Sequence, residues 1–213
     1  NIIGDYPHPA SYGYVKRRGT VANALPHCEK KIILRADIRN FFPSISREKI
    51  FNKFKELGIS EHVSSLLASF VTIDGFLPLG IHSSPMLANL ICLELDRQFT
   101  SLATEYNCAY TRYADDITFS GNVTIPCKDI IKELLQDHGF SLAENKFRII
   151  KNGQSNFVTG LSVSGKRPHV PRRMKRRLRQ VLYYCNKFGI RDHLFHEYGS
   201  ARFFLFQSGI NSI

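Results

Sequence analysis

The chain of 213 residues lacks the sequence features of membrane, disulfide-rich and zinc-binding proteins. No signal peptide opens it, and no apolar run approaches the ~18 residues needed to span a bilayer. Its cysteines are odd in number, widely spaced and without a Cys-x-x-Cys pair. They are Cys28, Cys92, Cys108, Cys127 and Cys185. Neither a disulfide framework nor a zinc site is indicated, which favours a reducing, cytoplasmic setting without a membrane partner.

Acidic residues are also scarce. The chain has 18 Asp and Glu against 29 Lys and Arg, with a net charge of +11. The excess is local, because the segment 166–179 holds eight basic residues and no acid, which leaves 11 − 8 = +3 for the rest. A routine solvated helix face would mix charges of both signs. The composition therefore predicts a patch that binds phosphates of an anionic partner.

Two adjacent aspartates stand out in this basic chain, in the stretch Tyr113-Ala114-Asp115-Asp116. On either side, apolar and polar residues alternate as in a half-buried strand, so the pair should sit at the bend of a β-hairpin. Adjacent carboxylates repel each other unless a cation lies between them, and hard oxygen ligands suit Mg²⁺. An acidic surface turn is the alternative, and a bare Asp-Asp favours it.

A third carboxylate follows a near-continuous apolar run, in the segment 31–38 that includes Asp37. The run is typical of a buried central strand, where an aspartate is costly unless it is paired or metal-bound. Beside the hairpin it would complete a three-carboxylate cage for two Mg²⁺ ions, with Mn²⁺ as a substitute. Two such ions, roughly 3.5–4 Å apart, promote phosphoryl transfer.

Three motifs taken in order resemble the palm of reverse transcriptases, most closely the bacterial retron and defence-associated group. They are Asp37-x-x-x-Phe41-Phe42, the segment from Gly80 to Asn89, and Arg-Tyr-Ala-Asp-Asp followed by a Thr-Phe-Ser strand. The resemblance covers residues 12–189. It implies an α+β fold with an antiparallel palm sheet backed by helices. Partial fingers would occupy residues 1–30, the palm 31–154, and a primer grip with a basic helical thumb 155–213.

The same resemblance implies an RNA-directed DNA polymerase of retron or antiviral-defence type. Its substrates would be an RNA template, a DNA or RNA primer and deoxynucleoside triphosphates, with a structured non-coding RNA as a further partner. The two Mg²⁺ ions would be held by Asp37, Asp115 and Asp116, with the carbonyl of Ile38 as an extra ligand.

The resemblance also implies roles for residues around the nucleotide. Phe42 would lie under the sugar and exclude a 2′-hydroxyl. Lys146 would protonate the departing pyrophosphate, although a surface lysine is an equal alternative. Arg17 and Arg18 would contact the triphosphate or template phosphates, with a solvated basic turn as the alternative.

A loop before the predicted helix 84–105 would pack against the nascent base pair. The chain keeps most of the family's pattern there, namely Leu77, Pro78, Gly80, Ser84, Pro85 and Asn89. It departs from the pattern at Leu79, where glutamine is expected, and at His82, where proline is expected. Leu79 and Gly80 would still contact the nucleotide, but the apolar side chain removes one polar contact. Ser84 is predicted to be the N-cap of the helix.

Hydrophobic periodicity predicts further helices at 46–58, 60–71, 127–139 and 193–207. The helix at 60–71 should turn Val63, Leu66, Leu67 and Phe70 inward. The segment 156–163 reads as a strand resembling the primer grip, where Gly160 would let a nucleic-acid strand approach. A basic helix then begins at Pro171. Its expected phosphate contacts are Arg172, Arg173, Lys175, Arg176, Arg177 and Arg179.

Two functions of other classes compete with a templated polymerase. A nucleic-acid-binding scaffold with the polymerase shape but without activity would fit the departures at Leu79 and His82. A second two-metal phosphoryl transferase, such as a cyclase or an untemplated nucleotide polymerase, would fit the same carboxylates.

Overall fold

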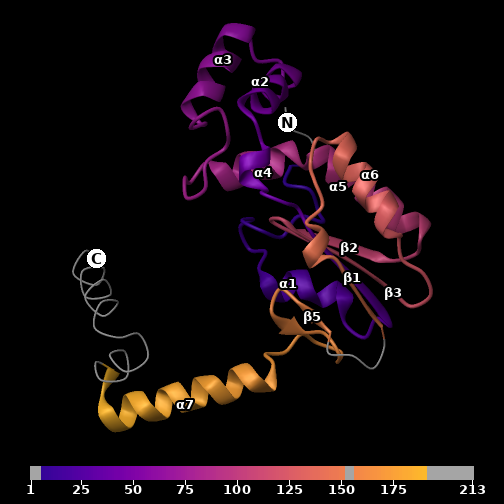
Figure 1. Cartoon of the computed structure of the whole chain (residues 1–213), viewed down its shortest axis with the longest axis vertical. Helices are drawn as coiled ribbons and strands as arrows, with labels where there is room; N and C mark the ends of the chain where they lie inside the picture. Colours follow the sequence, from indigo (N-terminus) through magenta and orange to yellow (C-terminus); the bar gives the residue numbers. More distant parts are fainter. Residues whose placement is uncertain (1–5, 152–155, 191–213) are drawn as a thin grey trace. The chain divides into compact units, whose positions relative to one another are not determined.

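A computed structural model describes residues 6–151 and 156–190. The chain divides into two compact units, Asn1–His169 and Val170–Ile213. The first unit contains an antiparallel sheet backed by helices, so the predicted α+β class is confirmed (Figure 1). The predicted boundaries near residues 30 and 154 stay predictions, and the predicted primer-grip segment belongs to the first unit.

The sheet of the first unit has four strands in the order β2-β3-β1-β4. The strands are β1 (Ile32–Asp37), β2 (Ala109–Tyr113), β3 (Asp116–Gly121) and β4 (Arg148–Lys151). All three pairings are antiparallel, and β1 lies between β3 and β4. A central strand is covered on both faces, which explains the near-continuous apolar run that predicted it.

The two faces of this sheet have different neighbours (Figure 1). Leu34, Ala36, Ile117 and Phe119 lie in the main core together with buried residues of the two helices α5 (Leu93–Glu105) and α6 (Lys128–Asp137). Because successive residues of a strand point to opposite faces, Ile33, Arg35 and Asp37 share the other face.

That other face is partly covered by short elements. Ile33 packs in a second core cluster with Ala24, Val158 and Val163. These residues belong to α1 (Thr20–Ala24) and to the hairpin formed by β5 (Phe157–Val158) and β6 (Leu161–Ser162), or lie beside it. A 3₁₀ turn, η1 (Leu25–His27), follows α1. The face therefore carries apolar packing at one end of β1 and Asp37 at the other.

The prediction of a single strand at 156–163 is wrong, because the segment contains the tight β5–β6 hairpin. Its turn residues Thr159 and Gly160 have φ values of 46° and 79°. Two consecutive residues with positive φ form the turn that matches the twist of paired strands. The backbone conformation of this turn therefore explains a glycine at position 160. The predicted approach of nucleic acid to Gly160 stays a prediction.

The helix predicted to run from Ser84 to about Glu105 is two helices, α4 (Ser84–Ile91) and α5, separated at Cys92. Cys92 has a ψ of 1° instead of a helical value, which interrupts the axis. Ser83 precedes the first helical residue, so Ser84 is not the N-cap that the sequence predicted. The hydroxyl of Ser84 is buried and has no hydrogen-bond partner among the described residues.

Helices α2 (Arg47–Glu56) and α3 (Glu61–Phe70) form where they were predicted. Ser46 caps α2, since its hydroxyl accepts a hydrogen bond from the Lys49 amide at 3.2 Å. The predicted inward face of α3 is wrong, however. Its buried residues are Ser64 and Ala68, whereas Phe70 is 83% exposed.

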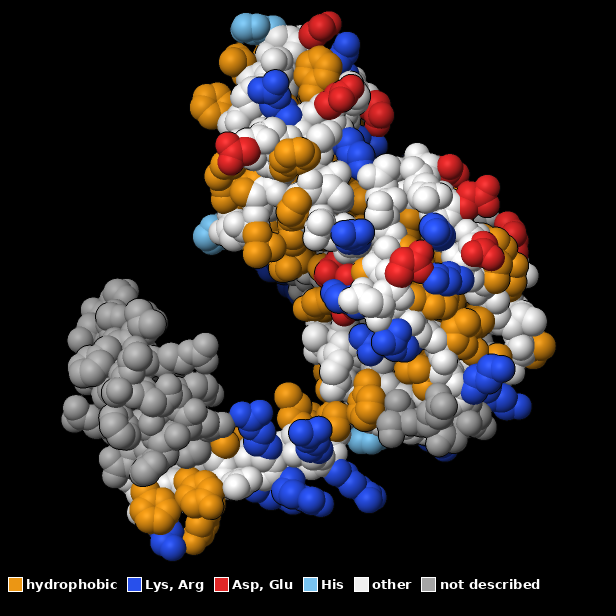
Figure 2. Space-filling model, viewed as in Figure 1, with side chains coloured by type: hydrophobic (Ala, Val, Ile, Leu, Met, Phe, Trp, Pro, Cys, Tyr) orange, Lys and Arg blue, Asp and Glu red, His pale blue; other side chains and the backbone are white. Residues whose placement is uncertain are grey.

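The residues predicted to point inward from α3 are all exposed, namely Val63, Leu66, Leu67 and Phe70. Figure 2 shows the resulting apolar side chains over the α2–α3 end of the unit. The physical reason is that small side chains let α3 approach α2 closely, so its large side chains face away.

Helix α6 confirms the prediction at 127–139, with Ile131 and Leu135 fully buried. In the second unit, helix α7 (Arg172–Phe188) confirms the predicted basic helix and is followed by Gly189 at a φ of 88°. Figure 2 shows the Lys and Arg side chains along it. The predicted helix at 193–207 lies outside the described residues. Among residues 6–151 and 156–190, no helix has the length and apolarity that crossing a membrane requires.

Candidate active site

The hairpin of β2 and β3 closes with a two-residue turn, Ala114-Asp115, because Tyr113 and Asp116 are its last paired residues. Ala114 has a φ of 57° and is buried. This backbone region is uncommon for residues other than glycine, so neighbouring groups must hold the turn. The predicted bend at the Asp-Asp pair is confirmed, with Asp115 in the turn and Asp116 opening the next strand.

The three predicted carboxylates come from adjacent strands. Asp37 is paired with Asp116 in the register of β1 and β3, and the amide of Ile38 donates to the carbonyl of Asp115 at 3.1 Å. Burial raises the pKa of Asp115, and the charge of Asp37 adds to that rise. Burial likewise raises the pKa of Asp116, where Arg35 opposes the effect and Asp115 and Asp37 reinforce it. Mutual repulsion of this kind is relieved when a cation binds.

Two basic side chains touch these carboxylates. Lys146, in the 3₁₀ turn η3 (Glu144–Lys146), donates from its ammonium to Asp37 Oδ2 at 2.8 Å. This hydrogen bond raises the pKa of Lys146, which keeps the ammonium charged. Arg35 Nη2 lies 3.8 Å from Asp116 Oδ1, at the distance of a loose ion pair.

The expected cage is not closed. Within the described parts of the chain, no three His, Cys, Asp or Glu side chains gather as a metal centre. The charge next to the Asp37 carboxylate is instead the ammonium of Lys146, 2.8 Å from Oδ2. The donor set of carboxylate oxygens nevertheless fits a hard divalent cation, which would replace the ammonium as the neutralising charge.

The residues predicted to contact the nucleotide lie in two segments, the turn after β1 and the turn before α4. Phe42 lies in the 3₁₀ turn η2 (Phe42–Ser44) after β1, buried, and its ring centroid is 6.3 Å from that of Tyr14. Leu79 is 77% exposed in the turn before α4, and Gly80 has a φ of 90°. Their contacts with a nucleotide, like the role of the Ile38 carbonyl, remain predictions.

Arg17 and Arg18 differ in their surroundings. Arg17 is exposed and has a φ of 64°. Arg18 Nη1 donates to the carbonyls of His8 at 2.6 Å and Ser11 at 2.7 Å. Arg18 thus holds the N-terminal loop together, and the predicted phosphate contacts of both arginines stay predictions.

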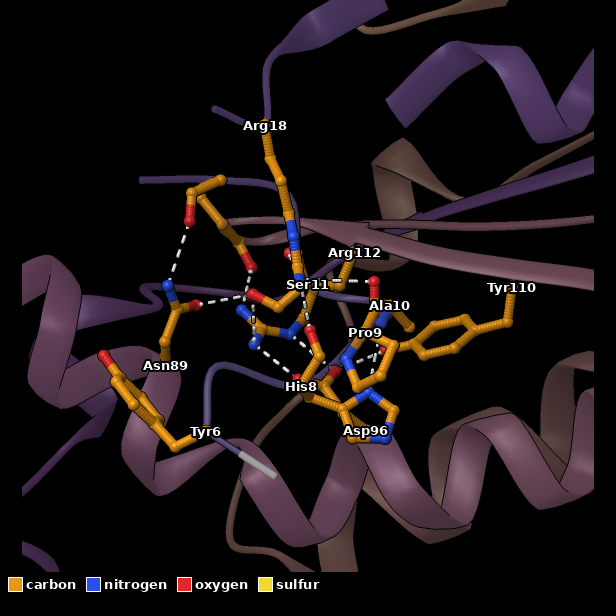
Figure 3. A network of polar contacts seen from close by, with 12 residues as sticks. Tyr6, His8, Pro9, Ala10, Ser11, Arg18, Asn89, Asp96, Tyr110 and Arg112 are labelled. Carbon is orange, nitrogen blue, oxygen red and sulfur yellow. Dashed lines mark hydrogen bonds and ion pairs between the residues drawn. The ribbon is translucent and has the colours of Figure 1, made fainter. Parts of the chain in front are cut away.

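Sequence reasoning missed a buried ion pair directly behind the turn (Figure 3). Arg112 and Asp96 are fully buried and form two hydrogen bonds, Nε to Oδ1 at 2.8 Å and Nη2 to Oδ2 at 2.6 Å. The hydroxyl of Tyr110 also donates to Asp96 Oδ1, at 2.7 Å. Burial lowers the pKa of Arg112, but Asp96 outweighs it, so the guanidinium stays charged.

This pair supports the strained turn. Arg112 Nη1 donates to the carbonyl of Ala114 at 3.0 Å, so the guanidinium fixes the residue with positive φ just before Asp115. The signal in the sequence was an acid at position 96, within the apolar pattern of a helix, and an arginine inside a buried strand. Buried charges need partners, so the two could have been paired.

The N-terminal loop is fastened to the same turn. Ser11 donates to Asn89 Oδ1 at 3.0 Å, and Asn89 Nδ2 donates to the carbonyl of Gly13 at 2.9 Å (Figure 3). A Cβ added to Gly13 would lie 2.4 Å from the amide nitrogen of Ala114. Glycine is therefore required for this close approach, and the loop, α4 and the hairpin form one assembly.

His27 bridges the two strands β2 and β3 on the sheet face opposite to the buried Arg112–Asp96 pair. Its Nδ1 lies 2.7 Å from Ser120 Oγ, and its Nε2 lies 2.7 Å from Thr111 Oγ1. Burial lowers the pKa of His27 to about 3, with Lys30 adding to the effect, so the ring is neutral. It acts as a crosslink between β2 and β3.

Comparison with known protein families matches residues 4–169 to the family described as reverse transcriptase (RNA-dependent DNA polymerase). The chain belongs to the reverse transcriptase family. The match takes in the sheet, the hairpin turn and the β5–β6 hairpin. The family resemblance carried by Asp37, the segment 80–89 and Tyr-Ala-Asp-Asp is thereby confirmed.

The relatives of this chain include retron reverse transcriptases. It is 32% identical over 191 residues to the retron Ec86 reverse transcriptase of Escherichia coli, covering 87% of this chain and 60% of that protein. It is 29% identical over 224 residues to the retron Mx162 reverse transcriptase of Myxococcus xanthus, covering 88% and 46%. The chain therefore spans about half of the length of the curated relatives it matches.

Solved structures with a similar fold include telomerases. The telomerase of Candida albicans in complex with a fragment of telomeric RNA superposes with a TM-score of 0.53 at 11% identity, over 86% of this chain and 41% of that one. Apo telomerase of Candida tropicalis gives 0.52 at 14% identity, over 75% and 36%. The likeness supports the palm fold. Reverse transcriptases use divalent metal ions, which agrees with the carboxylate oxygens at the turn.

Proposed function

We propose that this chain forms the catalytic core of an RNA-directed DNA polymerase of retron type, which transfers nucleotides by a two-metal mechanism. The observation that carries the proposal is the placement of Asp37 opposite Asp116, with Asp115 in the adjoining turn. Three carboxylates at the end of the central strand β1 and in the adjoining hairpin supply the negative charge that two divalent ions would balance. We assign these ions as Mg²⁺, with Mn²⁺ as a substitute.

When bound, the ions would activate the attacking 3′-oxygen and stabilise the leaving pyrophosphate. Asp37, Asp115 and Asp116 would hold them, with the carbonyl of Ile38 as an extra ligand. Lys146 would leave Asp37 as the ions enter and would give its proton to the pyrophosphate oxygen. The hydrogen bond from Lys146 to Asp37 supports this role, because it keeps a charged ammonium next to the carboxylates.

The partners follow from the family and from the basic residues. The proposal includes an RNA template, a DNA or RNA primer, deoxynucleoside triphosphates and a structured non-coding RNA, since the relatives are retron reverse transcriptases. Gly160 in the β5–β6 turn would face the primer, and α7 would track the duplex. An antiviral-defence role belongs to the same proposal.

Incorporation of labelled nucleotide into a primer tests the function. Synthesis that requires template, primer and Mg²⁺ is expected. Absent incorporation, with nucleic-acid binding intact, would favour the inactive scaffold that Leu79 and His82 suggest. Incorporation that does not require a metal ion would contradict the two-metal mechanism. Product formed without any template would favour the untemplated polymerase instead.

Phe42 is expected to set the choice of sugar. Its aromatic ring would lie beneath C2′ and leave no room for a hydroxyl, so wild type should prefer deoxynucleotides. Phe42→Ala should raise ribonucleotide incorporation relative to deoxynucleotide incorporation by roughly 5- to 150-fold, since steric exclusion of a hydroxyl is worth on the order of 1–3 kcal/mol. Single-nucleotide extension with the two sugars measures the ratio. Equal use of both sugars by wild type would contradict the role.

The basic face of α7 is expected to bind phosphates. Changing Arg172, Arg173, Arg176 and Arg177 to alanine should weaken binding of all sequences alike. The slope of log K against log salt should flatten by roughly 0.7–0.9 for each lost contact. Titration of labelled primer–template at several salt concentrations measures it. A wild-type slope in the variant would mean that α7 faces a different partner.

A further inference from the structure

Two arginines lie directly opposite each other on the sheet face that carries the carboxylates. Arg35 of β1 is paired with Arg148 of β4 in the antiparallel register. Residues paired in this way project from the same face, so both share the face of Asp37 and Asp116.

These arginines line one side of an open cavity of about 430 Å³ whose other walls are the catalytic candidates. Its polar and charged lining residues are Arg35, Asp37, Asp116, Asn145, Lys146 and Arg148. Acidic groups gather at the end of β1, and basic groups lie beside them. The cavity therefore offers a cation site and an anion site next to each other.

The arginine pair has no adequate structural explanation. Like charges directly opposite on neighbouring strands destabilise a sheet. Among the described residues, Arg35 has one ion pair, the loose contact with Asp116 at 3.8 Å, where both side chains are 36% exposed. Arg148 is exposed and donates to the neighbouring Phe147 carbonyl at 2.7 Å. A phosphate between the two guanidinium groups would turn the repulsion into attraction, because a guanidinium matches phosphate oxygens in two-point geometry.

The position of the pair along β1 indicates what the phosphate belongs to. Ile33 packs against the β5–β6 hairpin, and Asp37 marks the carboxylates, with Arg35 midway between them on the same face. Two residues of a strand span ~6.6 Å, so Arg35 lies about one nucleotide from the carboxylates. A nucleic-acid strand that reaches the carboxylates with its 3′ end, coming from the side of the β5–β6 hairpin, must pass over Arg35.

We infer that Arg35 and Arg148 form a phosphate subsite that holds the backbone of the growing strand next to its 3′ end. The inference rests on the proposed polymerase function. The same chemistry would also recognise the phosphates of an incoming nucleotide, and the experiment separates the two sources. In either case the ligand is a phosphate group one step from the reacting atoms.

Equilibrium binding tests the subsite without requiring catalysis. Arg35→Gln and Arg148→Gln are compared with Arg47→Gln, a matched loss of one exposed charge on α2. Affinity for primer–template is measured by fluorescence anisotropy across salt concentrations, and affinity for a deoxynucleoside triphosphate by calorimetry. Arg35→Lys retains the charge and should retain most of the salt dependence.

Loss of primer–template affinity by about tenfold, with a salt slope flatter by roughly 0.7–0.9, is expected for each glutamine variant. Thermal stability should be unchanged or higher, because like-charge repulsion is removed. If only nucleotide affinity falls, the phosphate belongs to the nucleotide. If neither affinity changes more than in Arg47→Gln, the subsite does not exist. A wild type that binds primer–template but never extends it would refute the proposed function while the binding comparison still decides the subsite.

Discussion

Asp37→Asn and Asp115→Asn are each expected to abolish nucleotide incorporation while the fold and nucleic-acid binding persist. Each change replaces a negatively charged carboxylate by a neutral amide. The metal ions that these carboxylates would hold supply several kcal/mol of transition-state stabilisation. A loss of that size corresponds to roughly a 10³-fold lower rate. Burial and Asp37 already raise the pKa of Asp115, so replacing its carboxylate by a neutral amide should not destabilise the metal-free protein.

Single-turnover extension in Mg²⁺ measures this loss, with thermal unfolding and primer–template binding measured on the same preparations. Asp137→Asn is the matched control, because Asp137 is an exposed carboxylate at the end of α6. It should extend primers at the wild-type rate. Carboxylate variants that polymerise as fast as this control would remove Asp37 and Asp115 from the catalytic site.

Asp96→Asn is expected to lower the free energy of unfolding strongly. It would leave the fully buried guanidinium of Arg112 without its bidentate partner. Breaking a buried pair in this way costs about 3–5 kcal/mol in the free energy of unfolding. Because Arg112 also holds the carbonyl of Ala114, the turn that presents Asp115 should lose its support as well. Urea unfolding measures the cost, and extension assays below the unfolding transition measure the effect on the turn.

The same helix provides the control. Glu94 of α5 pairs with Arg97 at 3.2 Å, but both side chains are about half exposed. Exposed pairs contribute about 0–1 kcal/mol, so Glu94→Gln should change stability little. Replacing both members of the buried pair by apolar residues, Asp96→Leu with Arg112→Met, should cost less than the sum of the two single changes. Equal effects of Asp96→Asn and Glu94→Gln would show that the buried pair is not a major support of the fold.

Local sequence pattern was sufficient for the elements whose residues interact with near neighbours. The apolar run before Asp37 predicted β1, and the Asp-Asp pair between alternating segments predicted the β2–β3 turn. The basic helix α7 followed from its composition and periodicity. Helix α2 formed where its periodicity predicted it, and Ser46 caps it by a contact with a residue three positions along the chain.

Periodicity could not decide which apolar residues meet a partner. Val63, Leu66 and Phe70 form a regular stripe, yet α3 turns Ser64 and Ala68 toward α2. The pattern shows that one face differs from the other, and only the packing of neighbours determines which face is covered. The break at Cys92 between α4 and α5 was not predicted either, because no glycine or proline marks a helix end there.

By itself the sequence determined the family, the central strand, the hairpin turn and the identity of the three carboxylates. The tertiary structure decided their surroundings: the bond from Lys146 to Asp37, the support of Ala114 by Arg112 and Asp96, and the facing of Arg35 and Arg148. These contacts join residues that lie up to 113 positions apart along the printed chain. Such pairings depend on strand register and on the desolvation of charges inside the fold, and neither is written in a local stretch of residues.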